Sequence, residues 1–138
     1  MKRAVTGTII AMLLLTTLGS GAAVAHTTAS NTSLTINKIP GGATRPGARV
    51  IIYGRLRSFR ATCRANKVVK LIRVRPGPNL VLARDRTDNE GEYRFVRRPS
   101  RDQTVYTKFA GTLRTSYGHS HRCRRDRSTN VFVNIRGR

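Results

Sequence analysis

Apolar and polar residues alternate along most of the chain after residue 31, in short runs separated by Gly, Pro, Asn and Asp. No window shows apolar residues at the spacing of an amphipathic helix, whereas alternation over runs of this length is typical of half-buried strands. The pattern therefore predicts an all-β protein. The strands that we expect lie at 32–36, 48–56, 67–74, 79–87, 92–96, 103–111 and 129–135.

The same pattern predicts how these strands are arranged. About seven short strands in about 105 residues are typical of an antiparallel two-sheet β-sandwich with one core. Gly54, inside the second predicted strand, indicates a bulge or the close approach of another backbone. The turn at 88–91 predicts a hairpin between the strands that flank it. Apolar residues occupy both faces of 67–74, so the register of that strand stays open.

The first 25 residues have the pattern of a targeting segment. They begin with two basic residues, continue through an apolar run that is too short to span a membrane, and end in Ala-Val-Ala at 23–25. This order is typical of a secretory signal peptide cleaved after residue 25, with an uncleaved anchor as the alternative. We therefore predict a secreted or envelope-associated protein with no transmembrane segment after cleavage, a flexible segment at 26–31 and one domain at 32–138.

The predicted mature chain is strongly basic. The whole chain has 27 Lys and Arg against six Asp and Glu, and cleavage would remove two basic residues, leaving a net charge of +19. Most of the basic residues are arginines, which favour bidentate contacts with phosphate or carboxylate; Arg-rich codon use explains that bias equally well. A field of this sign attracts polyanions over a Debye length of about 8 Å. The composition thus indicates an anionic partner without identifying it.

Cys63 and Cys123 both follow the predicted cleavage site. An even number of cysteines in an oxidising compartment indicates a disulfide. Neither cysteine belongs to a C-x-x-C pair, which argues against a zinc site. A bond between them would close a loop of about 60 residues and stabilise the fold by about 4 kcal/mol in the chain-entropy model.

A motif in the middle of the chain has the form V-x-L followed by T-D-x-x-G-x-Y-x-F. The residues that carry it are Val69, Leu71, Thr87, Asp88, Gly91, Tyr93 and Phe95. It resembles the carboxypeptidase-regulatory-like and transthyretin-like modules of secreted bacterial proteins, and the flanking cysteines resemble those of small bacterial immunoglobulin-like modules. The resemblance covers about 48–111 and implies an immunoglobulin-like or transthyretin-like sandwich. In it the aspartate caps a turn, the glycine has a positive φ and the aromatics enter the core.

A disulfide between the two cysteines would gather arginines at one end of the sandwich. The arginines that flank the cysteines are Arg60, Arg64, Arg122, Arg124 and Arg125. Together they would form a candidate site for an anionic cell-envelope polymer or another polyanion. A solvated basic surface without a selected ligand is the alternative. Few aromatic residues accompany the charges, so sequence-specific binding of nucleic acid is not indicated.

His26 supports a different hypothesis. As the first mature residue it would bind copper through its amino group and its ring, as the first residue of histidine-brace copper proteins does. His119 or His121 would supply a further nitrogen, because residues two apart in a strand point to the same side. That hypothesis implies a copper-dependent oxidative enzyme. A polar segment with incidental histidines is the alternative.

Motifs of hydrolytic enzymes are missing from the sequence. It has no G-x-S-x-G motif, and most of its acidic residues lie in one turn, far from the histidines in sequence. We therefore predict a secreted, monomeric, non-enzymatic binding module without a cofactor, acting through its arginine-rich end. The copper-binding protein and a purely structural envelope protein remain the alternatives.

Overall fold

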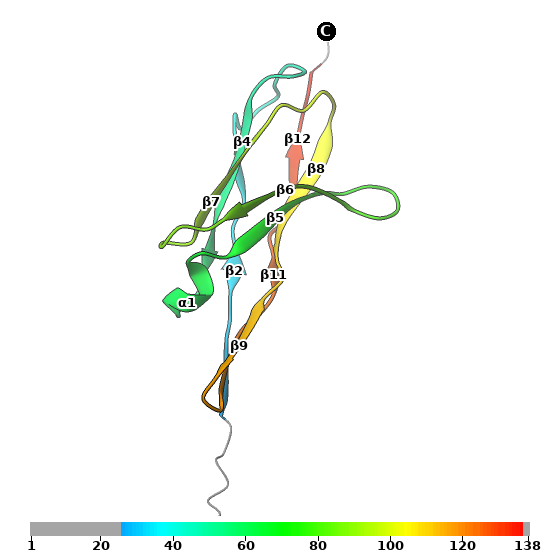
Figure 1. The fold of residues 1–138 in the computed structure, drawn as a ribbon. Coiled ribbons are helices and arrows are strands. Elements are labelled where there is room, and N and C mark those ends of the chain that lie inside the picture. Colours follow the sequence, from blue (N-terminus) through cyan, green and yellow to red (C-terminus); the bar gives the residue numbers. More distant parts are fainter. Residues whose placement is uncertain (1–25, 137–138) are drawn as a thin grey trace, which may run out of the picture.

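Two antiparallel sheets packed face to face form the body of the molecule (Figure 1). The computed structural model describes residues 26–136. In the first sheet, β4 is central and pairs with β2 and β3 along one edge and with β7 along the other. These strands are Ser33–Leu34 (β2), Asn37–Ile39 (β3), Val50–Arg57 (β4) and Glu92–Arg97 (β7).

The second sheet has the strand order β11-β8-β5-β6, and β12 also pairs with β8. Its strands are Val68–Arg73 (β5), Leu80–Arg86 (β6), Gln103–Phe109 (β8), Asp126–Arg127 (β11) and Val131–Val133 (β12). All pairings in both sheets are antiparallel. The predicted all-β sandwich is thus confirmed.

A third sheet, of order β1-β10-β9, extends the molecule at the end opposite residue 136 (Figure 1). Its strands are Thr27–Ser30 (β1), Thr112–Ser116 (β9) and His119–Cys123 (β10). The described residues therefore form twelve strands rather than about seven. The only helix in this part of the chain, Ala61–Arg64 (α1), is too short to cross a membrane.

The core lies between the two large sheets, where alternate residues of each strand point inward. The most completely buried apolar residues of its central strands are Val50, Ile52, Leu56, Val69, Leu71, Val105 and Phe109. The open register of 67–74 is therefore settled, with Val69 and Leu71 inside. Gly54 makes the predicted close approach, because a Cβ there would lie 1.9 Å from the carbonyl oxygen of Thr35.

The predicted hairpin around 88–91 is wrong, because its two strands belong to different sheets. β6 pairs with β5, and β7 pairs with β4. Backbone hydrogen bonds on either side of the turn explain the divergence. The Thr87 N–H donates to Lys67 O (2.9 Å) in the second sheet, whereas Gly91 O accepts from the Leu56 N–H (2.8 Å) in the first. The turn therefore connects the layers of the sandwich.

The segment at 26–31, which we expected to be flexible, instead contains β1. This strand runs parallel to β10, and Thr27 is paired with Ser120. Backbone hydrogen bonds hold both of its ends, from the Ser120 N–H to His26 O (3.2 Å) and from the Arg124 N–H to Ser30 O (3.0 Å). The predicted strand at 32–36 is shorter than expected, with only β2 inside it. The predicted signal peptide lies outside the described residues.

Candidate anion-binding surface

The predicted disulfide is present and joins α1 to the end of β10. The Cα atoms of Cys63 and Cys123 are 5.4 Å apart, and both residues are buried. The bond fixes the third sheet to the sandwich, because α1 follows directly on the end of β4. It also determines where the five candidate arginines lie.

Three of these arginines come together. Arg122, Arg124 and Arg125 line one shallow hollow between β9, β10 and the residues that follow β8. The other residues that line it are Ala29, Ala110, Gly111, Thr112, Leu113 and Cys123. No carboxylate is among the described residues of this hollow, so the guanidinium groups have no counter-ion there. We call Arg122, Arg124 and Arg125 the arginine hollow.

The other two candidates lie elsewhere, so the five arginines do not form one ring. Arg60 approaches Nδ1 of His121 at 2.9 Å, and successive residues of a strand point to opposite faces. Arg122 therefore projects from the face of β10 opposite the one that Arg60 contacts. Arg64 lines a separate hollow with Arg57 and Glu90.

A second group of cations lies on the Arg60 face of the third sheet. Arg114 of β9 is paired with His121 of β10, so both side chains project to that face. Burial, together with the guanidinium of Arg114, lowers the pKa of Lys67. The smaller of the two causes, the charge of Arg114, shows that Lys67 lies close to this group of cations.

The acidic side chains form few ion pairs with the cations, because most of them are bonded to backbone N–H groups. The carboxylates of Asp85, Asp88, Asp102 and Asp126 each accept at least one backbone N–H, as in the bond from Leu34 to Asp126 (2.6 Å). Within residues 26–136, the one ion pair joins Arg55 to Glu92 (2.7 Å). Apart from Arg55, the basic side chains of residues 26–136 therefore have no partner of opposite charge.

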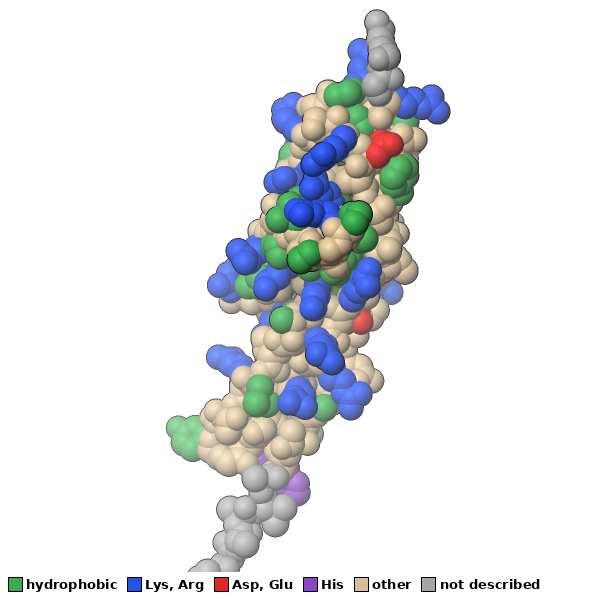
Figure 2. All heavy atoms as spheres, turned by 90° about the vertical axis from the view of Figure 1, so that its right-hand side faces the viewer, with side chains coloured by type: hydrophobic (Ala, Val, Ile, Leu, Met, Phe, Trp, Pro, Cys, Tyr) green, Lys and Arg blue, Asp and Glu red, His purple; other side chains and the backbone are tan. Residues whose placement is uncertain are grey.

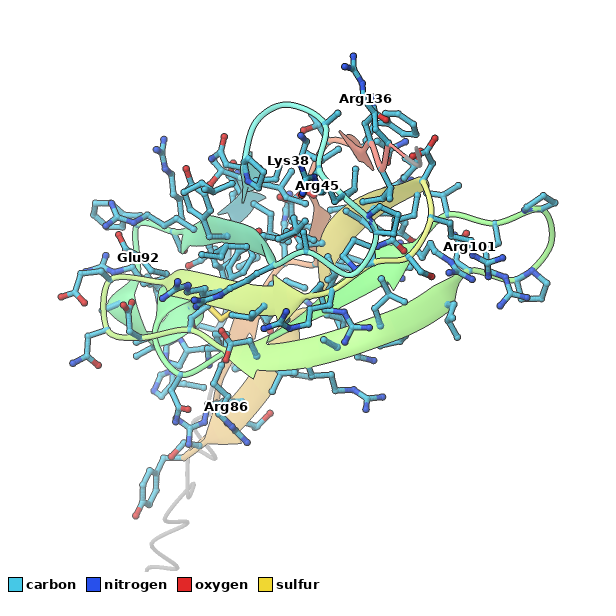
Figure 3. All side chains as sticks on the ribbon, turned by 90° about the horizontal axis from the view of Figure 1, so that it is seen from above. Lys38, Arg45, Arg86, Glu92, Arg101 and Arg136 are labelled. Atoms are coloured by element: carbon cyan, nitrogen blue, oxygen red, sulfur yellow. A yellow bond between two sulfur atoms is a disulfide. The ribbon has the colours of Figure 1, made fainter. Side chains whose placement is uncertain are left out.

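The surface views show how the basic side chains are distributed. Lys and Arg side chains spread along most of the length of the face in Figure 2, down to the tip that carries the histidines, and acidic side chains occupy two small areas of it. In the view of Figure 3, Arg86, Arg101 and Arg136 lie on the outside of the sheets. The positive charge is therefore distributed over the sandwich and is not confined to the arginine hollow.

The histidines of the copper hypothesis share one end of the third sheet. The register places His26 beside His119, and His121 projects to the same face two residues further along. The ring of His121 contacts the Thr28 hydroxyl (3.0 Å) as well as Arg60. In residues 26–136, no three His, Cys, Asp or Glu side chains form a group that would hold a metal ion.

Four of the seven motif residues have the turn and core positions that we expected of them. Asp88 caps the turn by accepting the N–H groups of Glu90 (3.0 Å) and Glu92 (2.8 Å), and Gly91 has a φ of 88°. Tyr93 and Phe95 are both buried in the core. These residues therefore serve the fold. The sequence matches no family model and no curated protein.

Proposed function

We propose that this protein is a secreted, non-enzymatic binding module of the cell envelope that holds anionic polymers through its arginine hollow. The observation that carries the proposal is the convergence of Arg122, Arg124 and Arg125 on one hollow without a carboxylate. Guanidinium groups bind carboxylate and phosphate bidentately, and such bonds are about twice as strong as neutral ones. The protein needs no cofactor for this role.

Other observations support the same function. The aspartates are bound to backbone N–H groups, so their carboxylates serve the fold rather than acid–base chemistry. The basic amino terminus, the apolar run and the Ala-Val-Ala sequence support export, and the capped turn supports membership of the carboxypeptidase-regulatory-like or transthyretin-like modules. We propose a monomer that presents this surface to the envelope.

Binding to immobilised polygalacturonate at increasing NaCl tests the proposal. We expect the affinity of the wild-type protein to fall steeply with salt, because binding releases counterions from the polymer. The Arg122→Ala/Arg124→Ala/Arg125→Ala variant should bind about tenfold more weakly at low salt, since it loses three charge-assisted contacts.

The matched control removes the same charge from exposed sites outside the hollow. It is Arg45→Ala/Arg49→Ala/Arg75→Ala, whose three side chains are all exposed. It should retain most of the affinity. Equal losses in the two variants would contradict the proposal, because they would show that only net charge matters.

A further inference from the structure

Four basic residues form a straight row across the outer face of the second sheet. Arg84 of β6 is paired with Lys70 of β5, Lys70 with Lys108 of β8, and Lys108 with Arg127 of β11. Residues that are directly opposite in antiparallel strands project to the same side of the sheet. We call these four residues the basic row.

The alternation of buried residues shows that the basic row faces outward. Val69 and Leu71, on either side of Lys70, are fully buried in the core, as is Phe109 beside Lys108. The carboxylate of Asp126 is on the inner side, where it accepts the Leu34 N–H. Asp85, which adjoins Arg84 in sequence, likewise projects to the opposite side of the sheet from the row and accepts the Arg94 N–H of the first sheet (2.8 Å). Both acidic residues next to the row in sequence are thus directed away from it.

This arrangement is unfavourable for the protein alone. Like charges directly opposite on neighbouring strands destabilise a sheet. Among the described residues, the side chains of Arg84, Lys70 and Lys108 have no hydrogen-bond or ion-pair partner within the usual distances. Arg127 lies 3.8 Å above the ring of Tyr106 and donates to Asn130 (2.8 Å). An anion that follows the row would relieve the repulsion at all four strands.

The basic row continues into the arginine hollow. Arg125, which lines the hollow, precedes β11, where the row ends at Arg127. Gly111 lines the hollow just after β8, and a Cβ there would lie 3.0 Å from the backbone nitrogen of Arg125. A ligand that occupies the hollow can therefore extend along the row without a break in positive charge.

We propose that the basic row and the arginine hollow together bind one linear acidic polysaccharide, which crosses the strands with about one acidic sugar per strand. This inference rests on the proposed function and specifies its ligand. Neighbouring strands are about 4.8 Å apart, a spacing comparable with the length of one sugar ring in an extended chain. Because the sheet is rigid, it favours a stiff polymer whose charges repeat at the same spacing as the strands.

The surroundings of the row favour a polysaccharide over single-stranded nucleic acid. Proteins that bind single strands stack bases on exposed aromatic rings. The aromatic residue next to the row, Tyr106, is only 6% exposed and lies beneath the guanidinium of Arg127. Phe132 on the same face is 53% exposed, but it is paired with Thr104, four residues along β8 from Lys108. The four cations of the row therefore have no exposed ring beside them, which suits a ligand that is held through its charges.

The test measures the affinity of the predicted mature protein, residues 26–138, for oligogalacturonates of one, two, four and eight units. We expect the affinity to rise steeply up to four units, because each further unit reaches another strand. The Lys70→Gln/Lys108→Gln variant removes the centre of the row and should bind the tetramer and octamer about tenfold more weakly. Its unfolding temperature should equal or exceed that of the wild type, since the substitutions relieve repulsion.

The matched control, Arg45→Gln/Arg75→Gln, removes the same charge outside the row and should keep the length dependence. Equal affinity of the row variant and the control variant for the octamer would contradict a role of the basic row in binding. The proposed function would survive that result if the Arg122→Ala/Arg124→Ala/Arg125→Ala variant still bound more weakly. If only the row variant lost affinity, and the arginine-hollow variant bound as tightly as the wild type, the arginine hollow would not be part of the binding site. Tighter binding of an oligophosphate or an oligodeoxynucleotide of equal charge would overturn the polysaccharide assignment.

Discussion

Tyr93 shows how one polar atom holds the two layers together. Its ring lies in the core, 3% exposed, and its hydroxyl reaches from β7 of the first sheet to Thr107 Oγ1 in β8 of the second (2.7 Å). The hydroxyl also donates to the carbonyl oxygen of Thr35 (2.5 Å). Burial raises the pKa of Tyr93 to about 12, and the bond with Thr107 opposes that rise only partly.

This raised pKa predicts a loss of stability in alkali. The unfolded tyrosine loses its proton near pH 10, and the folded one near pH 12. Below pH 10 the contribution of the neutral hydroxyl is complete. Between pH 10 and 12 the unfolded state binds fewer protons than the folded state, so the free energy of unfolding falls by about 1.4 kcal/mol per pH unit from this group.

Urea unfolding of the wild type and Tyr93→Phe from pH 8 to 11.5 measures this contribution. We expect Tyr93→Phe to be less stable by about 1 to 3 kcal/mol at pH 8, because Thr35 and Thr107 lose a buried partner. This difference in the free energy of unfolding should shrink above pH 10, because only the wild type has a hydroxyl at position 93 that ionises more readily in the unfolded state. Tyr53→Phe, at a more exposed site, is the control. A difference that stays constant with pH would contradict the assignment.

At the scale of elements, the third sheet differs from the sandwich in having almost no core of its own. Most side chains of β1, β9 and β10 are exposed, and Ser30 and Cys123 are the buried exceptions. A small sheet without an apolar face has little independent stability. The disulfide at Cys123 therefore contributes much of what holds this sheet in place.

Reduction of the disulfide should release the third sheet first. Hydrogen exchange at the amides of β9 and β10 should accelerate strongly after reduction, whereas the amides of β4, β5 and β8 stay protected by the core. The global free energy of unfolding should fall by up to about 4 kcal/mol for a loop of 60 residues. The Cys63→Ser/Cys123→Ser variant should behave like the reduced protein. Unchanged exchange in β10 would show that backbone pairing alone is sufficient.

The same contrast explains how much of the fold the sequence predicts. Alternation identifies strands that have one buried face, which is why β2, β4, β5, β6, β7, β8 and β12 overlap predicted strands. It fails for β1, β9 and β10, because a strand with both faces in solvent carries no alternating signal. The one local signal was the two-residue turn Tyr117-Gly118, where both residues have positive φ, as hairpin turns require.

The candidate site was predictable only in part for a related reason. The disulfide followed from the number of cysteines, and the arginines next to Cys123 in sequence do line one hollow, whereas Arg60 and Arg64 lie elsewhere. The direction of each side chain depends on the register of β10, which the sequence did not reveal. The basic row was invisible in the sequence, because Lys70, Arg84, Lys108 and Arg127 meet only through long-range strand pairing.

At the scale of the whole molecule, the fold separates the two signs of charge. Four aspartates bind backbone groups, while most arginines lie on the surface without acidic partners. Such a surface repels itself, and the repulsion destabilises the folded state relative to the more expanded unfolded chain. A polyanion that covers the arginine hollow and the basic row would stabilise the protein in proportion to its affinity and concentration.

Unbound protein should therefore become more stable as salt is added. The Debye length falls from about 30 Å at 0.01 M to about 8 Å at 0.15 M, so repulsion between separate basic surfaces is largely screened. We expect the unfolding temperature to rise by roughly 5 °C over that range, since about 1 kcal/mol shifts it by that much in a domain of this size. Arg45→Gln/Arg75→Gln/Arg136→Gln should start higher and rise less. A melting temperature that falls with salt would mean that attractive pairs dominate, contrary to the separation of charge described above.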